Sequence, residues 1–257
     1  MSFLPPSPPD GHRIGTIALV GAGPGAADLL TLRALDRLRN ADVVFYDRLV
    51  DPEVLVLTPA RKVFVGKEVA ANAWPQARIN RVIVAAAMDG LRVVRLKSGD
   101  PSVFGRACEE LEAARSFGIP VEIVPGITAA SAAAASLGRP LTERGRTERL
   151  VLATATCRPG ETANLSGAFV PGTTLALYMA MHRLSVVEAE LLAAGAPGDC
   201  EVEFVQGAGT AGQRILTTTL RGMAAAATGL SNPAIILIRW PKTVDRMACA
   251  PALAETS

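Results

Sequence analysis

Residues 14–39 read IGTIALVGAGPGAADLLTLRALDRLR, and this stretch predicts a strand, a glycine-rich turn and a helix in direct succession. The run IGTIALV is apolar and short, as a buried strand requires. Leucines then recur at helical spacing from Leu29 to Leu38, so we expect a helix over residues 28–39. A strand that passes into a helix through a tight loop is typical of α/β proteins with parallel sheets.

The same alternation continues as far as the middle of the chain. Strands that alternate with helices imply a mainly parallel sheet, here with five strands. The predicted strands cover residues 14–20, 41–47, 61–66, 91–100 and 121–126, and the predicted helices cover residues 28–39, 52–57, 103–116 and 127–136, with one more beginning near Pro75.

Beyond Gly138 the rhythm changes, because strands follow one another with fewer helices between them. Close spacing of strands permits antiparallel pairing, so a second, mixed α/β domain is expected. The predicted strands there cover residues 150–156, 174–180, 201–207, 213–220 and 233–240.

These patterns predict two α/β domains with the active site in the cleft between them, since ligand clefts favour such junctions. The expected divisions are a tail at 1–13, an N-terminal domain at 14–137, a C-terminal domain at 138–246 and a tail at 247–257.

Composition excludes several classes of protein. Hydrophobic residues make up 49% of the 257 residues and aromatic residues only 4%, so a disordered chain is excluded and the core must be mainly aliphatic. Lys and Arg total 26 against 24 Asp and Glu, and this balance lacks the basic excess of a general nucleic-acid binder. The four cysteines form no close pair and there are only two histidines, which argues against a disulfide framework or a metal centre.

The sequence also lacks the marks of a membrane or secreted protein. No apolar run reaches the roughly 18 residues of a membrane span. The N-terminal stretch MSFLPPSPPDGHR has no apolar core of the kind that a secretory signal needs. We therefore expect a soluble cytoplasmic protein with no membrane partner.

The glycine loop at residues 21–25 admits more than one interpretation. A glycine turn between strand and helix lets a ligand approach the backbone, and Asp47 ends the second strand where a dinucleotide-binding enzyme holds a ribose. Pro24 removes a backbone donor, however, and the spacing G-x-G-x-G lacks the usual third glycine position. A tight turn with no ligand is the other alternative.

The stretch LKSGDPSVFGRACEE at residues 96–110 places glycine and an acid after the fourth strand, where open α/β sheets bind ligands. Simpler roles remain open here: Asp100 as a helix cap, and Arg106 with Glu109 as a surface ion pair.

Two further stretches of sequence also allow both structural and binding roles. The small residues of VPGITAASAAA at 124–134 serve close packing or leave room for a flat ring. Met179, in YMAM, lies at a strand end where a core position is the commoner role.

Taken together, these motifs resemble the uroporphyrinogen-III C-methyltransferase family of S-adenosylmethionine-dependent tetrapyrrole methyltransferases. The similarity runs from about Ile17 to Val244 and includes VGAGPG, ADVVFYDRLV, VFVGK, PQ-x-x-IN, RLKSGDPSVFGR, VPGIT, RPLTER, YMAM and PAIILI. The resemblance implies methylation of uroporphyrinogen III at carbons 2 and 7 to precorrin-2, for sirohaem or cobalamin. It also implies a homodimer.

The resemblance assigns site residues one by one. Cofactor contacts, to S-adenosylmethionine or its product S-adenosylhomocysteine, are implied for Pro24, Ser98, Gly99, Asp100, Val103, Thr128, Ala129, Met179 and Ala208. Proton acceptor and donor roles are implied for Asp47 and Lys67, with Glu109 as another candidate base, and substrate contacts for Arg48, Arg106, Arg144 and Met179. No metal ligand is implied.

The chain departs from the family pattern mainly on the substrate side. Ser98 replaces a glycine, Ala107 and Cys108 replace the glycines of GRGGEE, and Glu143 replaces the histidine of THR. These changes keep two alternatives open, which are a later corrin-ring methyltransferase and a tetrapyrrole-binding paralogue without turnover.

Overall fold

A computed structural model describes residues 13–66, 74–156, 165 and 167–242. The described chain forms two compact units, residues 13–136 with 207–213 and residues 137–206 with 214–242. We describe each unit by itself.

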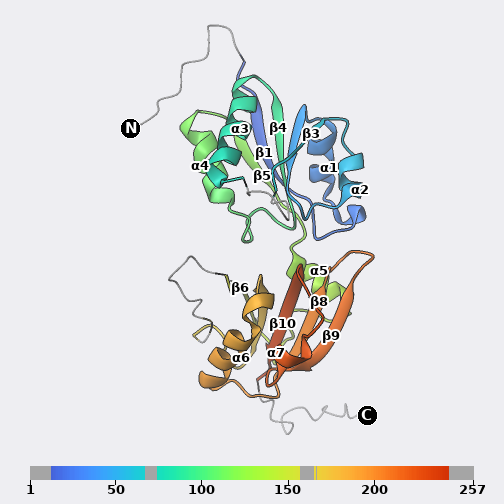
Figure 1. Cartoon of the computed structure of the whole chain (residues 1–257), viewed down its shortest axis with the longest axis vertical. Helices are drawn as coiled ribbons and strands as arrows, with labels where there is room; N and C mark the ends of the chain where they lie inside the picture. The colour runs from blue at the N-terminus through green and yellow to red at the C-terminus, as the bar shows by residue number, and fades with distance from the viewer. Residues whose placement is uncertain (1–12, 67–73, 157–164, 166, 243–257) are drawn as a thin grey trace, which may run out of the picture. The chain divides into compact units, whose positions relative to one another are not determined.

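The first unit is built on a five-stranded sheet in which every pairing is parallel. This confirms the fold class predicted for the N-terminal domain. In spatial order the strands are β3 (Arg61–Phe64), β2 (Val43–Tyr46), β4 (Arg92–Lys97), β1 (Thr16–Gly21) and β5 (Val121–Val124), as Figure 1 shows.

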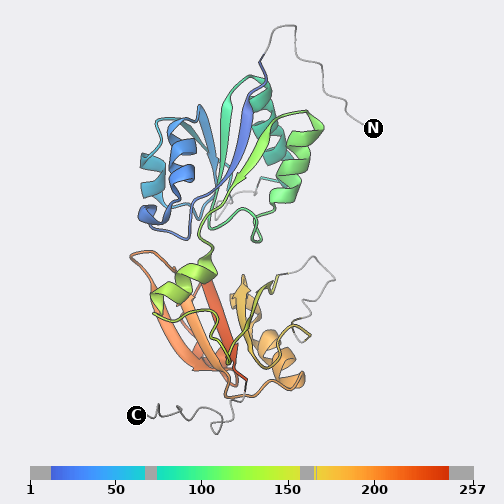
Figure 2. The same ribbon diagram turned by 180° about the vertical axis from the view of Figure 1, so that it is seen from behind.

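Helices cover both faces of this sheet, and the alternation of side chains along each strand explains why (Figures 1 and 2). On β1, Ala18 and Val20 join one apolar cluster with α1 (Leu32–Arg39) and α2 (Pro52–Val56). On the opposite face, Ile17 and Leu19 join a second cluster with α3 (Gln76–Met88) and α4 (Ala107–Ser116). The last helix of the unit is α5 (Ala129–Ser136).

The order of the strands locates the edge where a ligand would bind. From β1 the chain continues to β2, toward one edge of the sheet. From β4 it continues to β5, at the opposite edge. Such a reversal opens a crevice at the carboxyl ends of the two strands. A ligand is therefore expected beside the residues that follow β1 and β4.

Two predicted helix starts were wrong. A helix was expected from Asp28, but only a 3-10 turn (Ala27–Leu29) forms there, and α1 begins at Leu32 because the Thr31 hydroxyl accepts the Ala34 N–H at 3.1 Å.

The other wrong start is that of α4, which was expected at Val103 and begins at Ala107. Phe104 and Arg106 have φ of 53° and 57°, in the left-handed region, which cannot continue a right-handed helix.

The second unit contains a mixed sheet, as the sequence predicted. β6 and β7 are parallel, and the remaining neighbours are antiparallel. The spatial order is β6 (Arg149–Thr154), β7 (Thr173–Tyr178), β10 (Ala234–Trp240), β8 (Glu201–Gln206) and β9 (Arg214–Thr219).

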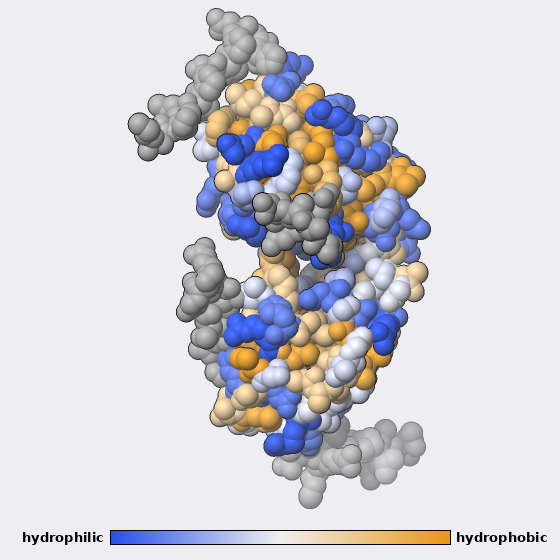
Figure 3. Space-filling view, in the orientation of Figure 1, coloured by the Kyte–Doolittle hydropathy of each residue, from blue (hydrophilic) through white to orange (hydrophobic). Residues whose placement is uncertain are grey.

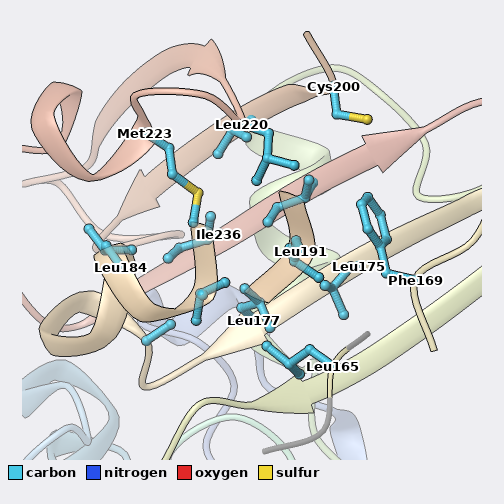
Figure 4. Packing of buried hydrophobic residues seen from close by; sticks show 14 of the residues in the cluster. Leu165, Phe169, Leu175, Leu177, Leu184, Leu191, Cys200, Leu220, Met223 and Ile236 are labelled. Carbon is cyan, nitrogen blue, oxygen red and sulfur yellow. The ribbon is translucent and has the colours of Figure 1, made fainter. Parts of the chain in front are cut away.

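One face of this sheet carries a large apolar core. Side chains from α6 (Leu184–Ala193) and α7 (Met223–Ala226) pack on it, and Figure 4 shows Met223 and Leu191 directed toward strand residues such as Ile236. The core is mainly aliphatic, as the low aromatic content predicted, with Phe169 and Phe204 as its buried aromatic residues.

The surface is mixed in character. Figure 3 shows hydrophilic and hydrophobic residues interspersed over both units on the face drawn. Within the described ranges, none of the helices has both the length and the apolar character needed to cross a bilayer.

Candidate active site

Three glycines pack backbone against backbone at the carboxyl edge of the first sheet. A Cβ on Gly126 would lie 2.3 Å from the Gly99 carbonyl oxygen, and one on Gly21 would lie 2.6 Å from the Gly126 Cα. Gly23 and Gly99 also exchange two backbone hydrogen bonds, at 3.2 and 2.7 Å. The loops after β1, β4 and β5 are thus drawn together, which only glycine permits.

Asp100 braces this arrangement. Its Oδ2 accepts the Gly126 N–H at 3.0 Å, and its Oδ1 accepts the N–H of Ser102 at 2.7 Å and the hydroxyl of the same residue. The alternative of a helix cap was wrong, because α4 begins at Ala107, seven residues later. The carboxylate instead ties the loop after β4 to the loop after β5.

The predicted cofactor residues of the first unit meet at this edge. Gly99 has φ of +69°, and a Cβ on it would meet nothing nearer than Thr128 Cα and Ala129 N, both at 4.0 Å. Val103 donates its N–H to the Asp100 carbonyl at 3.1 Å, while Ser98 follows directly on β4. Thus Gly99 faces the start of α5 with room beside its backbone.

Ala208, although far from Pro24 in sequence, belongs to the same unit as Pro24. The segment 207–213 groups with this unit. The Ala26 N–H donates to the Gly209 carbonyl at 2.8 Å, and a Cβ on Gly209 would lie 3.2 Å from Pro24 Cγ. Ala208 itself is buried.

A buried ion-pair network beside this edge was missed by the sequence analysis. Arg95 donates from Nη2 to both carboxylate oxygens of Asp47, at 2.7 and 2.8 Å, and from Nε to Glu110 Oε1 at 3.0 Å. Lys97 Nζ lies 2.8 Å from Glu110 Oε2. Burial and the nearby Arg95 charge lower the pKa of Lys97, although Glu110 opposes them. We refer to Asp47, Arg95, Lys97 and Glu110 as the charge cluster.

The cluster leaves Asp47 open to a further donor. Both oxygens of Asp47 accept from Arg95, but each keeps a second lone pair and the side chain is 32% exposed. A sequence signal for the cluster did exist: Arg95 and Lys97 flank Leu96 in the apolar part of a central strand, and burial of such cations requires a carboxylate partner.

Exposed basic side chains lie nearby in the chain. Arg106 forms a two-bonded ion pair with Glu109, at 2.8 and 2.7 Å, which is the surface pairing weighed as the simpler role. This hydrogen bonding raises the pKa of Arg106. Arg48 is exposed, and it has no hydrogen bond or ion pair to another residue in the described part of the chain. Lys67 lies outside the described residues.

Two predicted residues belong to the second unit. Met179 has φ of 54° and is 43% exposed, so the alternative of a core position was wrong; the strand ends at Tyr178 and the side chain is exposed. Arg144 is exposed in the turn that Glu143 and Thr147 close by mutual backbone hydrogen bonds of 2.8 Å.

The second unit also has a pocket of about 330 Å³ that contains none of the predicted site residues. Its lining includes Arg139, Arg146 and Arg239 opposite acidic residues such as Glu201. Because these charges oppose one another, the pocket shows no preference for an anion or a cation.

Several known proteins are similar to this chain over most of its length. A siroheme synthase of Methylococcus capsulatus is 43% identical over 230 residues, which is 87% of this chain and 48% of that protein. The chain thus spans about half the length of the curated relatives it matches.

The solved structures that share the fold include two methyltransferases. A uroporphyrin-III C-methyl transferase from Thermus thermophilus, complexed with S-adenyl homocysteine, has a TM-score of 0.77 and 39% identity over 88% of this chain and 97% of that one. A cobalt precorrin-4 methyltransferase has a TM-score of 0.76 and 27% identity over 88% and 95%. The pattern of the tetrapyrrole (corrin/porphyrin) methylases matches residues 16–224, and the chain belongs to that family.

Proposed function

We propose that this chain is an S-adenosylmethionine-dependent C-methyltransferase that methylates uroporphyrinogen III at carbons 2 and 7. The product would be precorrin-2, for sirohaem or cobalamin. The observation that carries the proposal is the similarity to a uroporphyrin-III C-methyl transferase over nearly the whole of that protein, with S-adenyl homocysteine bound there. The siroheme synthase relatives support the same reaction.

The residues at the carboxyl edge of the first sheet fit such a cofactor. Gly99 leaves its backbone approachable, and the surrounding small residues add no bulk. S-adenosylmethionine supplies a methyl group on a positively charged sulfur, so the main task of the chain is to hold the reactants in line. We assign cofactor contacts to Pro24, Ser98, Gly99, Asp100, Val103, Thr128, Ala129, Met179 and Ala208.

A proton must leave the ring after each transfer, and this requires a base. We assign that role to Asp47, with Lys67 as proton donor and Glu109 as a second candidate base. Asp47 is suited to it because its side chain is 32% exposed while Arg95 fixes its orientation.

The substrate carries eight carboxylates, and guanidinium groups bind carboxylates in pairs of hydrogen bonds without losing their charge. We assign these contacts to Arg48, Arg106 and Arg144, and a packing contact to Met179. The exposed positions of the three arginines are compatible with this role.

One observation favours a second candidate. The similarity to a cobalt precorrin-4 methyltransferase has nearly the same TM-score, so the fold also suits a later corrin-ring methyl transfer. A paralogue that binds a tetrapyrrole without turnover is the alternative outside catalysis.

The decisive experiment incubates the full chain with uroporphyrinogen III and methyl-labelled S-adenosylmethionine. Two labels per ring are expected, with loss of transfer in Asp47→Asn and normal transfer in Asp89→Asn, an exposed acid beyond α3. Saturable tetrapyrrole binding without label in the ring would instead identify a binding protein. Transfer only to a methylated corrin precursor would favour the second candidate.

We also propose a homodimer, which rests on the family resemblance. Two-fold dimers are the commonest oligomers of soluble proteins. Light scattering at micromolar concentration should give twice the mass of one chain, and a monomer would refute the proposal.

A further inference from the structure

Glu110 has more partners than Asp47, the other acid of the charge cluster, and its side chain is fully buried. It accepts from Arg95 Nε at 3.0 Å, from Lys97 Nζ at 2.8 Å and from Gln76 Nε2 at 3.2 Å. A buried carboxylate without such partners would be strongly unfavourable. The three contacts therefore fix its position closely.

Through Arg95, Glu110 reaches the group to which we assign proton removal. The Nε of the guanidinium is held by Glu110, and Nη2 binds both oxygens of Asp47. Because the guanidinium is planar and rigid, fixing one edge fixes the direction of the other. Together with the Leu96 carbonyl, which accepts from Arg95 Nη1 at 3.1 Å, Glu110 thereby fixes the guanidinium that orients the Asp47 carboxylate, without touching Asp47 itself.

Glu110 lies in the first turn of α4, and side chains of α3 brace that turn. Gln76 donates to Glu110 and also to Asn80 Oδ1 at 2.9 Å, and Asn80 donates to the Glu109 carbonyl at 3.0 Å. The PQ-x-x-IN motif thus anchors the turn that carries Arg106 and Glu109, a role that sequence reasoning did not give it.

We propose that Glu110 is a positioning residue of this site, which orients Asp47 through Arg95 and holds the first turn of α4 in register. The inference rests on the proposed function. The cluster can be buried or half-buried because its two carboxylates and two cations balance one another in charge.

The test compares Glu110→Gln with Glu112→Gln, a matched change at an exposed position two residues further along α4. In Glu110→Gln we expect kcat to fall at least tenfold, while the affinity for S-adenosylhomocysteine and the KM for S-adenosylmethionine stay within twofold. Hydrogen exchange should quicken at residues 46–48 and 105–109. Glu112→Gln should match the wild type in every measurement.

A second, charge-conserving variant keeps the proposal testable if Glu110→Gln does not fold. Arg95→Lys keeps every charge, but an ammonium cannot bridge Asp47 and Glu110 in the fixed geometry of a guanidinium. It should fold and show the same fall in kcat at unchanged cofactor affinity. If Glu110→Gln does not fold, a wild-type kcat in Arg95→Lys overturns the proposal.

Two results separate this inference from the proposed function. If the wild type transfers no methyl group, the proposed function fails, and hydrogen exchange at residues 46–48 still decides the role of Glu110. Unchanged exchange there in a folded Glu110→Gln, or a wild-type kcat in that variant, refutes the positioning role.

Discussion

Glu110 in the first unit and Glu203 in the second are buried carboxylates with the same kind of surroundings. Glu203 is 2% exposed and binds two arginines, Arg139 Nη1 at 2.9 Å and Arg239 Nε at 3.0 Å. Glu110 is likewise held by two cations, one of them an arginine bound through Nε. In the first unit Glu110 lies on α4 and Arg95 on β4, whereas in the second unit Glu203 and Arg239 lie on the adjacent strands β8 and β10.

The two arginines differ in the groups that their other guanidinium nitrogens contact. Arg95 reaches Asp47, whose side chain is a third exposed, whereas Arg239 reaches the Pro140 carbonyl at 2.8 Å and leaves its Nη2 without a partner within the described chain. The first arrangement orients an accessible carboxylate, while the second fastens the chain next to the sheet. Under our proposal, the buried pair of the first unit supports the chemistry, whereas that of the second unit supports stability.

The largest effect is expected from neutralising Glu203. Glu203→Gln leaves the buried Arg239 without a counter-charge, and breaking such a pair destabilises proteins by about 3–5 kcal/mol. Denaturant unfolding should show this loss, while the folded fraction keeps its methyl transfer rate. The partly exposed neighbour Glu201, which also binds Arg139, provides the control, and Glu201→Gln should lose no more than about 1 kcal/mol. A fall in kcat equal to that of Glu110→Gln would abolish the distinction between the two units.

An intermediate effect is expected at the exposed arginines, which belong to different units. Arg144→Ala and Arg106→Ala should each weaken substrate capture by about 1.5 to 3 kcal/mol if a charged hydrogen bond is lost. Arg106 must first release Glu109, an exposed pair worth roughly 0.2 to 0.5 kcal/mol, so its loss should be slightly the smaller.

The ratio kcat/KM for the tetrapyrrole measures this effect, with cofactor affinity as the internal control. A loss below about twofold in both variants would reject arginine recognition of the substrate.

The smallest effect is expected at the opposite end of the first sheet. The Arg92 guanidinium donates to Asp42 and holds the pKa of that carboxyl near 2, below its ordinary 3.8. The stabilisation is therefore complete above the ordinary pKa and is lost as pH falls toward 2.

Because this pair is largely exposed, Asp42→Asn should lower the unfolding midpoint by no more than about 2 °C at pH 7. The variant and the wild type should converge near pH 2. A persistent difference at that pH would mean that Asp42 acts by something other than its charge.

Local patterns in the sequence were sufficient to predict the strands and the two kinds of sheet. These patterns did not predict irregular backbone conformations. The sequence of residues 103–106 does not indicate that Phe104 and Arg106 adopt left-handed conformations. The clustering of Gly21, Gly99 and Gly126 depends on strand order, which periodicity does not contain.

The charge cluster shows the same limit for the site. Arg95 and Lys97 stand out as basic residues on an apolar strand, but their partner could not be chosen between Glu109 and Glu110 without the rotation of α4. The family resemblance supplied candidate contacts, and the structure adds the supports behind them.

We propose that the carboxyl edge of the first sheet binds the methyl donor, and a substitution at Gly99 tests this placement most directly. Gly99 and Gly118 have nearly equal φ, +69° and +68°, and no atom lies closer than 4.0 Å to a Cβ at either position. Gly99→Leu and Gly118→Leu should therefore suffer similar backbone strain, of about 1–2 kcal/mol. Only the first would fill the space beside Thr128 and Ala129.

The measurement is calorimetric titration of wild type and both variants with S-adenosylhomocysteine. We expect saturable binding to the wild type and Gly118→Leu, at least a tenfold loss in Gly99→Leu, and no saturable binding of NAD. Equal affinity in Gly99→Leu and the wild type, or micromolar binding of NAD, would contradict the account.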